Sequence, residues 1–549
     1  MLPALINVSL SLATAGALIK INQHRCVFTF RKPGCRMKEI KKERKNMSIF
    51  HSTMSRRQFM KAIGLAGAGT GAAALVGPNF HDLDEVVASG DNLQKHPWYV
   101  KERERLDPTV ELDWDLMQRY DRRYMGQCAN IRAKYLGRQR IVDTDANSGA
   151  LAKKQLVENL PGFGHKWEAL RVGLSQSNKW SVSFLGPEVS GKITAATPES
   201  LGVPKWQATP EENSKLIVAA IRLFGMAEAG FNHLDSTWRN KLVAKNEKGS
   251  STGMQWIDTD PANVPDTAAR PIVYEDVAEP YYTTTKWVVP TSDHWVLYLG
   301  GPEPRETDRT FPSRISKSNL VANSGTRNIA WYSTYNFIRA LGYNMFGGTG
   351  HGTDCFQTPG VAVLTGKAEN ARMSNWVISP AWGPRSTDVA QITNLPLAET
   401  HPIDAGLWRF CQSCGICADA CPSESIPKKG FEPTFEIPDI NGIADTQHAT
   451  GRKMYYFNGS SCNNWTKENY PGSGCSACAA HCTFSTGSGA MVHSVLKTTI
   501  SYVPIFNSFL ANMGRTFGYG PYEDPEQFWN ASLPQFGIDS TLTSTVKSQ

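Results

Sequence analysis

The stretch Cys411-Gln-Ser-Cys414-Gly-Ile-Cys417-Ala-Asp-Ala-Cys421-Pro422, near the C-terminus, has the spacing C-x2-C-x2-C-x3-C-P. This run is typical of bacterial proteins that bind iron–sulfur clusters through cysteine thiolates. A second run of four cysteines follows at Cys462, Cys475, Cys478 and Cys482. Zinc ribbons use two C-x2-C pairs rather than a four-cysteine run closed by C-P, so the spacing favours clusters over zinc or disulfides. The two runs therefore predict two [4Fe–4S] clusters in a ferredoxin-like module.

The spacing also predicts how the eight cysteines are shared between the clusters. In two-cluster ferredoxins the fourth cysteine of a run binds the other cluster. One cluster is therefore predicted on Cys411, Cys414, Cys417 and Cys482, and the other on Cys421, Cys462, Cys475 and Cys478. Cys128 and Cys355 lie outside both runs, and we expect them to be buried free thiols, with a disulfide between them as the alternative in an exported protein.

A second motif lies near the N-terminus, at Ser55-Arg56-Arg57-Gln58-Phe59-Met60-Lys61. The twin arginine precedes a weakly apolar run rich in Gly and Ala, which indicates a twin-arginine (Tat) export signal over residues 47–88. Val86-Val87-Ala88 offers a small-residue cleavage site, so the mature chain is expected to begin near Ser89. Residues 1–46 precede the ordinary start of such a signal, and we interpret them as an over-extended start.

The net charge of +7 belongs to this leader. Residues 1–88 hold thirteen Lys and Arg against five Asp and Glu, which leaves 44 basic and 45 acidic residues in 89–549. The mature part is therefore close to neutral and shows no basic excess that would indicate nucleic acid as a partner. No segment of the mature part is long and apolar enough to predict a membrane span.

The middle of the chain predicts alternating helices and strands. Thr209-Pro210-Glu211-Glu212 has the signature of a helix start, with Thr as N-cap and Glu at N3, followed by apolar residues on one face up to Phe224. Residues 286–290 and 295–299 read as strands, and 329–341 as a helix closed by Gly342. This alternation predicts an α/β (α+β) core.

The composition divides the chain into five parts. We expect a leader at 1–88, an N-terminal wrapping region with little periodicity at 89–205, and a catalytic core at 206–400. A loop-like joint at 396–406 leads into the two-cluster module at 401–490, and a C-terminal extension covers 491–549.

The order of these parts resembles the respiratory reductive dehalogenases. Short stretches of the sequence are also similar to members of that family. They are Asn79–Glu85, His96-Pro-Trp-Tyr, Pro204–Asn213, Pro402–Gly406 and Phe517-Gly-Tyr-Gly520. The resemblance covers essentially residues 47–530. It implies an enzyme of organohalide respiration that replaces a carbon–halogen bond by carbon–hydrogen in a chlorinated ethene or aromatic compound.

The resemblance also implies a cofactor that nothing in the composition shows. Family members bind a corrinoid of the cobalamin type, base-off, in a nitroreductase-like core. The base-off fingerprint D-x-H-x-x-G is absent here, since Asp445-Thr-Gln-His448 has the wrong spacing. Matching by position gives Gly347, Gly348, Gly350, Ser374 and Trp382 as expected corrinoid contacts, where small residues let backbone approach the ring. Taken singly, the glycines are also compatible with ordinary turns.

In the family an Arg and a Tyr act beside the substrate. Arg309, in Arg309-Thr-Phe-Pro-Ser313, matches the family arginine best, and Arg305 is second. A surface cation is the alternative for both. The expected tyrosine is not evident after the 209–230 helix, and the sequence does not choose among the others in this region, which are Tyr274, Tyr281, Tyr282, Tyr332 and Tyr335.

The family pattern further implies a small integral-membrane anchor protein, a quinone-linked or hydrogenase-linked electron donor, and a peripheral location on the outer face of the cytoplasmic membrane. Two other functions are alternatives. An epoxyqueuosine-reductase-like corrinoid enzyme acting on tRNA fits poorly with an export signal and a neutral mature surface. An exported electron-transfer subunit needs only about 80 residues, and this chain has some 300 more.

Overall fold

The computed structural model describes residues 96, 99–176, 181–183, 185–188, 196–250, 269–316, 326–347, 355–374, 376–472, 474–485 and 520–538. The predicted leader at 1–88 lies outside these residues, as do most of the C-terminal extension and Gly348 and Gly350. Within the described ranges, no helix combines the length and the apolar character needed to cross a bilayer.

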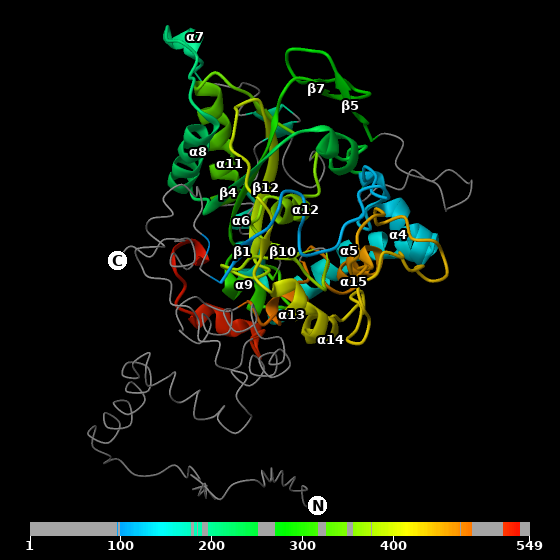
Figure 1. The fold of residues 1–549 in the computed structure, drawn as a ribbon. Coiled ribbons are helices and arrows are strands. Elements are labelled where there is room, and N and C mark those ends of the chain that lie inside the picture. The colour runs from blue at the N-terminus through cyan, green and yellow to red at the C-terminus, as the bar shows by residue number, and fades with distance from the viewer. Residues whose placement is uncertain are drawn as a thin grey trace, which may run out of the picture. The chain divides into compact units, whose positions relative to one another are not determined.

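The centre of the fold is a four-stranded sheet in the order β4-β8-β12-β9 (Figure 1). Its strands are β4 (Glu228–His233), β8 (Trp295–Pro302), β12 (Ser386–Thr393) and β9 (Met345–Phe346). Each neighbouring pair is antiparallel, with Leu299 of β8 opposite both Ala229 of β4 and Val389 of β12. The predicted mixed α/β fold is confirmed.

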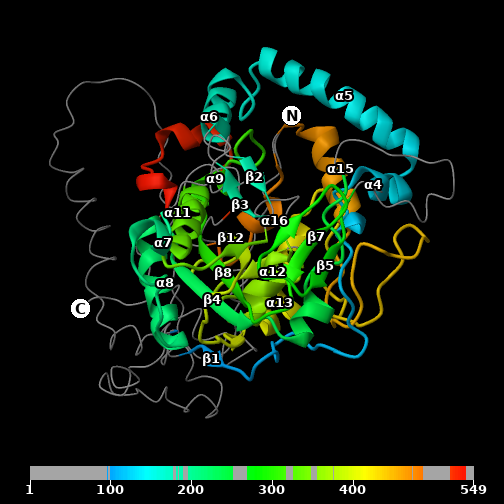
Figure 2. The same ribbon diagram turned by 90° about the horizontal axis from the view of Figure 1, so that it is seen from above.

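Helices cover both faces of this sheet because successive strand residues point to opposite faces. On β8, Leu297 and Leu299 pack with α8 (Pro210–Phe224) and α11 (Thr326–Ala340), whereas Val296 and Tyr298 pack with α12 (Thr358–Leu364). Figure 2 shows α8 and α11 together on one side of the sheet and α12 on the other.

The start and the apolar face of α8 are as the sequence predicted. Thr209 caps its N-terminus, and the two partners of the capping box bind each other's backbone N–H, with Glu212 N 3.2 Å from Thr209 Oγ1 and Thr209 N 3.1 Å from Glu212 Oε2. Gly225 ends the helix in the left-handed region, with φ of 102°. The predicted strands at 286–290 and 295–299 and the helix at 329–341 are also confirmed, as β7 (Trp287–Pro290), β8 and α11.

Replacing Thr209 by Ala should lower the free energy of unfolding by about 1 kcal/mol, because an N–H at the start of α8 loses its partner. Chemical denaturation followed by circular dichroism measures this change. Thr209→Ser is the matched control, since it keeps the hydroxyl and should retain most of the stability. Equal denaturation midpoints for Thr209→Ala and wild type would contradict the role of the cap.

Smaller sheets and short elements surround the core. β7 pairs in parallel with β5 (Ile272–Glu275) and antiparallel with β6 (Tyr281–Tyr282). The other pairs are β1 (Lys101–Glu102) with β13 (Ile403–Asp404), β2 (Ser181–Ser183) with β3 (Gly186–Glu188), and β10 (Glu369–Asn370) with β11 (Val377–Ile378). Short helical elements are η1 (Arg122–Tyr124), α7 (Pro198–Leu201), η2 (Trp238–Leu242), α9 (Arg305–Arg309), η5 (Pro525–Asn530) and η6 (Gln535–Gly537).

In the region 89–205, where the sequence showed little periodicity, the described residues form three helices of at least eight residues, besides the short η1 and α7. They are α4 (Ala129–Leu136), α5 (Arg138–Val157) and α6 (His165–Gln176). α5 lies at the edge of Figure 2, and only three of its twenty residues are buried. Polar contacts attach α4 and α5 to the C-terminal part of the chain, such as the Arg140–Glu468 ion pair at 2.7 Å and the hydrogen bond from Arg132 Nη1 to Asn464 Oδ1 at 3.0 Å. The mostly exposed α5 therefore has little apolar pattern that the sequence could show.

Candidate functional site

The eight cysteines of the two runs lie on or beside four short helices. Cys411 and Cys414 are on α13 (Leu407–Cys414), and Cys417 is on α14 (Ile416–Asp419). Gly415 joins these helices with φ of 77°, a conformation that favours glycine and folds the chain tightly enough to bring the thiols together. The second run uses α15 (Gly459–Asn469), which carries Cys462, and α16 (Ala477–Ala480), which carries Cys478, with Cys475 and Cys482 just outside α16.

The first predicted set of thiols lies together. Burial raises the pKa of the Cys411 thiol well above its ordinary value, and the neighbouring Cys414, Cys417 and Cys482 raise it further. Burial also raises the pKa of Cys482, with contributions from Cys414 and Cys417. Cys482 is thus close to cysteines about 65 residues earlier in the chain, and the crossed assignment of ligands stays a prediction.

The second predicted set also lies together. Burial raises the pKa of Cys478 well above its ordinary value, and Cys475, Cys417, Cys462 and Cys421 add to it. Burial raises the pKa of Cys475 to about 11, again with a contribution from Cys421. Cys417 of the first set is near Cys478, so the two sets are neighbours. Among the described residues, no three His, Cys, Asp or Glu side chains converge on the position of one metal ion.

The singleton cysteines have no part in either set. Cys128 and Cys355 are buried free thiols, as predicted. Cys128 Sγ lies 3.5 Å from the carbonyl oxygen of Gly249, and Cys355 is fully enclosed in the core.

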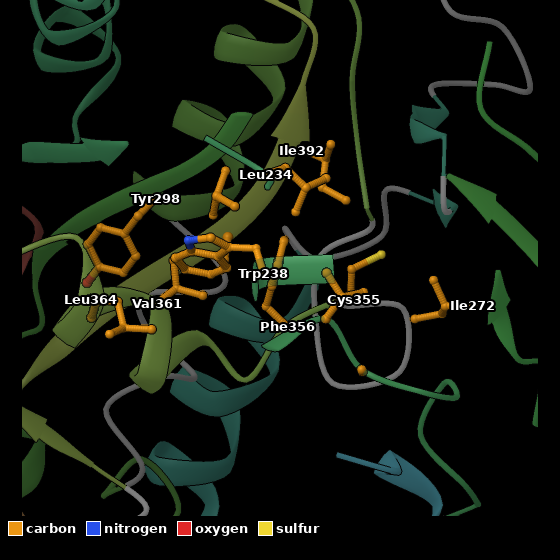
Figure 3. Packing of buried hydrophobic residues seen from close by; sticks show 14 of the residues in the cluster. Leu234, Trp238, Ile272, Tyr298, Cys355, Phe356, Val361, Leu364 and Ile392 are labelled. Carbon is orange, nitrogen blue, oxygen red and sulfur yellow. The ribbon is translucent and has the colours of Figure 1, made fainter. Parts of the chain in front are cut away.

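A cavity of about 880 Å³ lies between the core and the cysteine-bearing segments. This volume is at the upper end of the range of ligand pockets in proteins. Its apolar wall comes from the core side, where Trp238 and Phe356 meet edge to face with ring centroids 5.9 Å apart and Val361 and Leu364 lie nearby (Figure 3). Its opposite wall includes Cys462 and Cys475 of the second set. One end of the thiol array therefore opens on the cavity.

Several hydrogen-bond donors on the cavity wall are unpaired in the described part of the chain. The donors Trp238 Nε1, Gln447 Nε2 and Arg452 Nε are buried and have no partner within the described part of the chain. Buried donors are normally paired, so a bound molecule with acceptor groups would satisfy them. Ser374 also lines the cavity and adopts φ of 45°.

Tyr120 is the only tyrosine among the described residues that line the cavity. Burial raises its pKa above the ordinary value, Cys128 raises it further, and the nearby Arg452 and Arg122 oppose this. The phenol is therefore neutral and holds its proton at physiological pH. Arg122 and Arg452 also line the cavity, which places fixed positive charge near this phenol.

Comparisons with known proteins agree on one family. A family model described as the reductive dehalogenase subunit matches residues 95–397. The chloroethene reductive dehalogenase of Dehalococcoides mccartyi strain VS is 30% identical over 554 residues, which cover 90% of this chain and 99% of that protein. The trichloroethene reductive dehalogenase of Dehalococcoides mccartyi strain 195 is 29% identical over 577 residues, which cover 88% and 98%. The chain belongs to the reductive dehalogenase family.

The resemblance inferred from the sequence is thus confirmed, and the chain is an oxidoreductase of this family. Among solved structures, the catabolic reductive dehalogenase NpRdhA in complex with 3-bromo-4-hydroxybenzoic acid aligns with a TM-score of 0.48 and 16% identity. The alignment covers 78% of this chain and 50% of that one, so this chain spans about half the length of that dehalogenase.

The two arginines predicted to be catalytic are held away from the cavity of this family member. Arg309 donates to the Gly520 carbonyl at 2.9 Å and to Glu306 at 3.2 Å, and its guanidinium lies 4.2 Å from the ring centroid of Tyr522. Arg305 donates to the Ser485 carbonyl at 3.1 Å. Neither is among the residues that line the cavity, so their catalytic role gains no support from this geometry and stays a prediction.

The predicted corrinoid contacts are spread over different places. Ser374 lines the cavity, whereas Trp382 is buried against Ala227 and is not on the cavity wall. Gly347, with φ of 111°, lies beside Cys355, and Gly348 and Gly350 fall outside the described residues.

The tyrosines considered from the sequence do not line the cavity either. Two of them have partners elsewhere, since Tyr274 donates to the Arg239 carbonyl at 3.1 Å and Tyr281 donates to Glu275 at 2.7 Å. Tyr120 was missed because it precedes the predicted core by almost 90 residues. No local signal marks it, and only the folded chain brings it to the cavity.

Proposed function

We propose that this chain replaces the carbon–halogen bond of an organohalide by carbon–hydrogen, using electrons that pass through two [4Fe–4S] clusters to a corrinoid in the cavity. The observation that carries the proposal is the position of Cys462 and Cys475 on the cavity wall. It would place an electron-carrying group directly beside a large chamber with an apolar side. The relatives named for chloroethene, trichloroethene and tetrachloroethene favour a chlorinated ethene as substrate, with a chlorinated aromatic compound as the alternative.

The cysteine-rich segments would form a ferredoxin-like module with two clusters. Each predicted set of four thiols is gathered in the folded chain, and thiolate is the form that binds iron. Burial raises the pKa of Cys411 and of Cys478, and the positive charge of bound iron would favour their thiolate forms.

The cavity residues fit a corrinoid of the cobalamin type, whose edge carries many amide groups. The unpaired donors of Trp238, Gln447 and Arg452 would hydrogen-bond to such acceptors, and the flat apolar wall would contact the ring. When bound, this cofactor supplies a cobalt ion that delivers electrons to the carbon–halogen bond. The core would then be nitroreductase-like in the sense predicted from the sequence.

The chain's own residues would exclude water and supply the proton. Trp238, Phe356 and Leu364 give the chamber an apolar side that favours a small halogenated molecule over water. Tyr120 would donate the proton that the carbon receives as halide leaves. Arg452 would stabilise the negative charge that develops on the halide and on the phenolate.

Metal analysis and turnover together test this function. Anaerobically purified protein should contain about one cobalt for every eight irons, since two [4Fe–4S] clusters hold eight. With a reduced viologen dye as electron source, it should release chloride from a chlorinated ethene or benzene. Iron without cobalt would indicate the electron-transfer subunit. Cobalt-replete protein that dehalogenates no organohalide would contradict the proposal.

We also propose that the protein is exported by the Tat pathway and works peripherally on the outer face of the cytoplasmic membrane. A small membrane anchor protein and a quinone-linked or hydrogenase-linked donor would be its partners there. Replacing Arg56 and Arg57 by Lys keeps the charge but removes the planar guanidinium groups. The precursor should then stay unprocessed in the cytoplasm, as followed by immunoblotting of cell fractions. Processing of this variant at the wild-type rate would contradict the assignment.

A further inference from the structure

Arg372 holds the helix that carries Cys411 and Cys414. The residue follows β10 and is 1% exposed. Its Nε donates to the carbonyl oxygen of Cys411 at 3.1 Å, and its Nη2 donates to that of Gln412 at 2.9 Å. These carbonyls belong to the last turn of α13, where the helix dipole favours a positive charge. Three residues earlier, the Glu369 carboxyl accepts the N–H groups of Ala405 and Leu407 at the other end of α13.

The positive charge of Arg372 is not balanced by a carboxylate. Its remaining hydrogen bonds go to the carbonyls of Pro427 and Lys428 at 3.1 and 2.9 Å and to the Tyr455 hydroxyl at 3.0 Å. The guanidinium also lies 3.9 Å from the ring centroid of Tyr455. All of these partners are neutral, and no ion pair among the described residues includes Arg372.

This charge lies beside the first set of thiols. The carbonyl that Arg372 Nε binds belongs to Cys411 itself, and the carbonyl that Nη2 binds belongs to Gln412, which lies between Cys411 and Cys414. The main chain of Arg372 also hydrogen-bonds to the Cys411 thiol. A positive charge held at this position favours added negative charge on the neighbouring set.

Two basic side chains near the second set differ from Arg372 because each has an acidic partner. Arg314 donates to the carbonyl of Pro471, and Lys467 is on α15, the helix that carries Cys462. Each has an acidic partner, since Arg314 Nε is 3.6 Å from Glu168 and Lys467 Nζ is 2.9 Å from Asp145. The two sets thus differ in the charge that surrounds them.

We propose that Arg372 raises the reduction potential of the cluster held by Cys411, Cys414, Cys417 and Cys482, which makes this cluster the more easily reduced of the two. The inference rests on the two clusters of the proposed function. Reduction adds one electron to a [4Fe–4S]²⁺ cluster, and an unbalanced positive charge in a low-dielectric interior favours the added negative charge. Hydrogen bonds to the cluster sulfurs act in the same direction.

The inference also gives the clusters an order. Cys462 and Cys475 are on the cavity wall, whereas no cysteine of the first set is among its lining residues in the described chain. The cluster beside Arg372 is therefore the one farther from the cavity along the electron path. It would accept electrons first, one at a time, from a reduced donor outside the protein.

Redox titrations followed by electron paramagnetic resonance test the inference, with a reduced viologen as the one-electron donor. In Arg372→Met the cluster of the first set should become at least tenfold harder to reduce, a downward shift of about 59 mV for a one-electron couple. The other cluster should stay unchanged. Arg372→Lys keeps the charge and should stay within threefold of wild type. Arg385→Met is the matched control, since Arg385 is also 1% exposed and the charged groups that act on it are Asp308, Arg305, Glu303 and Glu306.

A second measurement covers the case in which Arg372→Met fails to bind the first cluster. Of the two signals in the wild type, Cys414→Ser should remove the one reduced at the higher potential, and Cys475→Ser the other. The inference is overturned if Arg372→Met leaves both potentials unchanged or if Cys414→Ser removes the lower-potential signal. Wild-type protein without two clusters would instead contradict the proposed function.

Discussion

Cys482→Ser is expected to abolish dehalogenation and to remove one of two cluster signals, the same signal that Cys411→Ser removes. The reason is that Cys482, although about 65 residues away in sequence, lies among Cys411, Cys414 and Cys417 in the folded chain. Cys421→Ser should remove the other signal, because Cys421 lies near Cys475 and Cys478. Either loss breaks the electron path, so turnover should fall to background in both variants.

Comparing the spectra of several variants shows which cysteines share a cluster. Two variants from the same set should leave the same residual spectrum after reduction, and two from different sets should leave complementary spectra. Cys128→Ser is the matched control, because Cys128 is a buried thiol outside both sets and a hydroxyl can make the same contact with the Gly249 carbonyl. It should keep both signals and most of the turnover. Identical residual spectra for Cys482→Ser and Cys421→Ser would contradict the crossed assignment.

The parts of the fold that the sequence predicted are those specified by neighbouring residues. The cap at Thr209, the apolar face of α8 and Gly225 lie within one helix length, so their signals are local. The cysteine runs are similar, since ligand spacing within a run reflects the local geometry of short helices. The position of Cys482 near Cys414 and Cys417 was predictable only because the pattern of two-cluster modules is known.

The missed elements depend on contacts between distant segments. β4 has Gly230 where a Cβ would come within 2.5 Å of Thr365 Oγ1, so its sequence is set by a close neighbour rather than by strand propensity. α5 is mostly exposed and is attached through polar side chains such as Arg140. Its sequence therefore lacks the apolar face from which an amphipathic helix is predicted.

The candidate site was predictable only in part for the same reason. Its thiols come from two short segments, but the cavity wall combines Tyr120, Trp238 and Arg452, which are more than 300 residues apart at the extremes. Sequence similarity over a few residues pointed to Arg309, whose catalytic role stays a prediction. In the folded chain this arginine binds Glu306 and Gly520, a setting that a family match over a few residues does not reveal.

The second large effect is expected at Tyr120, whose replacement by Phe should lower turnover by about 10²–10⁴-fold, the usual contribution of a positioned general acid. The phenol lines the cavity, and burial keeps it protonated by raising its pKa above the ordinary value of about 10. Phe preserves the ring and its packing but has no proton to give. Iron and cobalt contents should therefore stay at wild-type levels while chloride release falls.

The matched control for this variant is Tyr274→Phe. Burial raises the pKa of Tyr274 as well, but its hydroxyl donates to the Arg239 carbonyl outside the cavity wall, so turnover should change little. The two variants thus separate loss of a buried phenol in general from loss of the phenol at the cavity. Near-normal turnover in metal-replete Tyr120→Phe would remove Tyr120 as the proton donor. Since no other described tyrosine lines the cavity, a solvent proton delivered past Arg452 would then become the leading alternative.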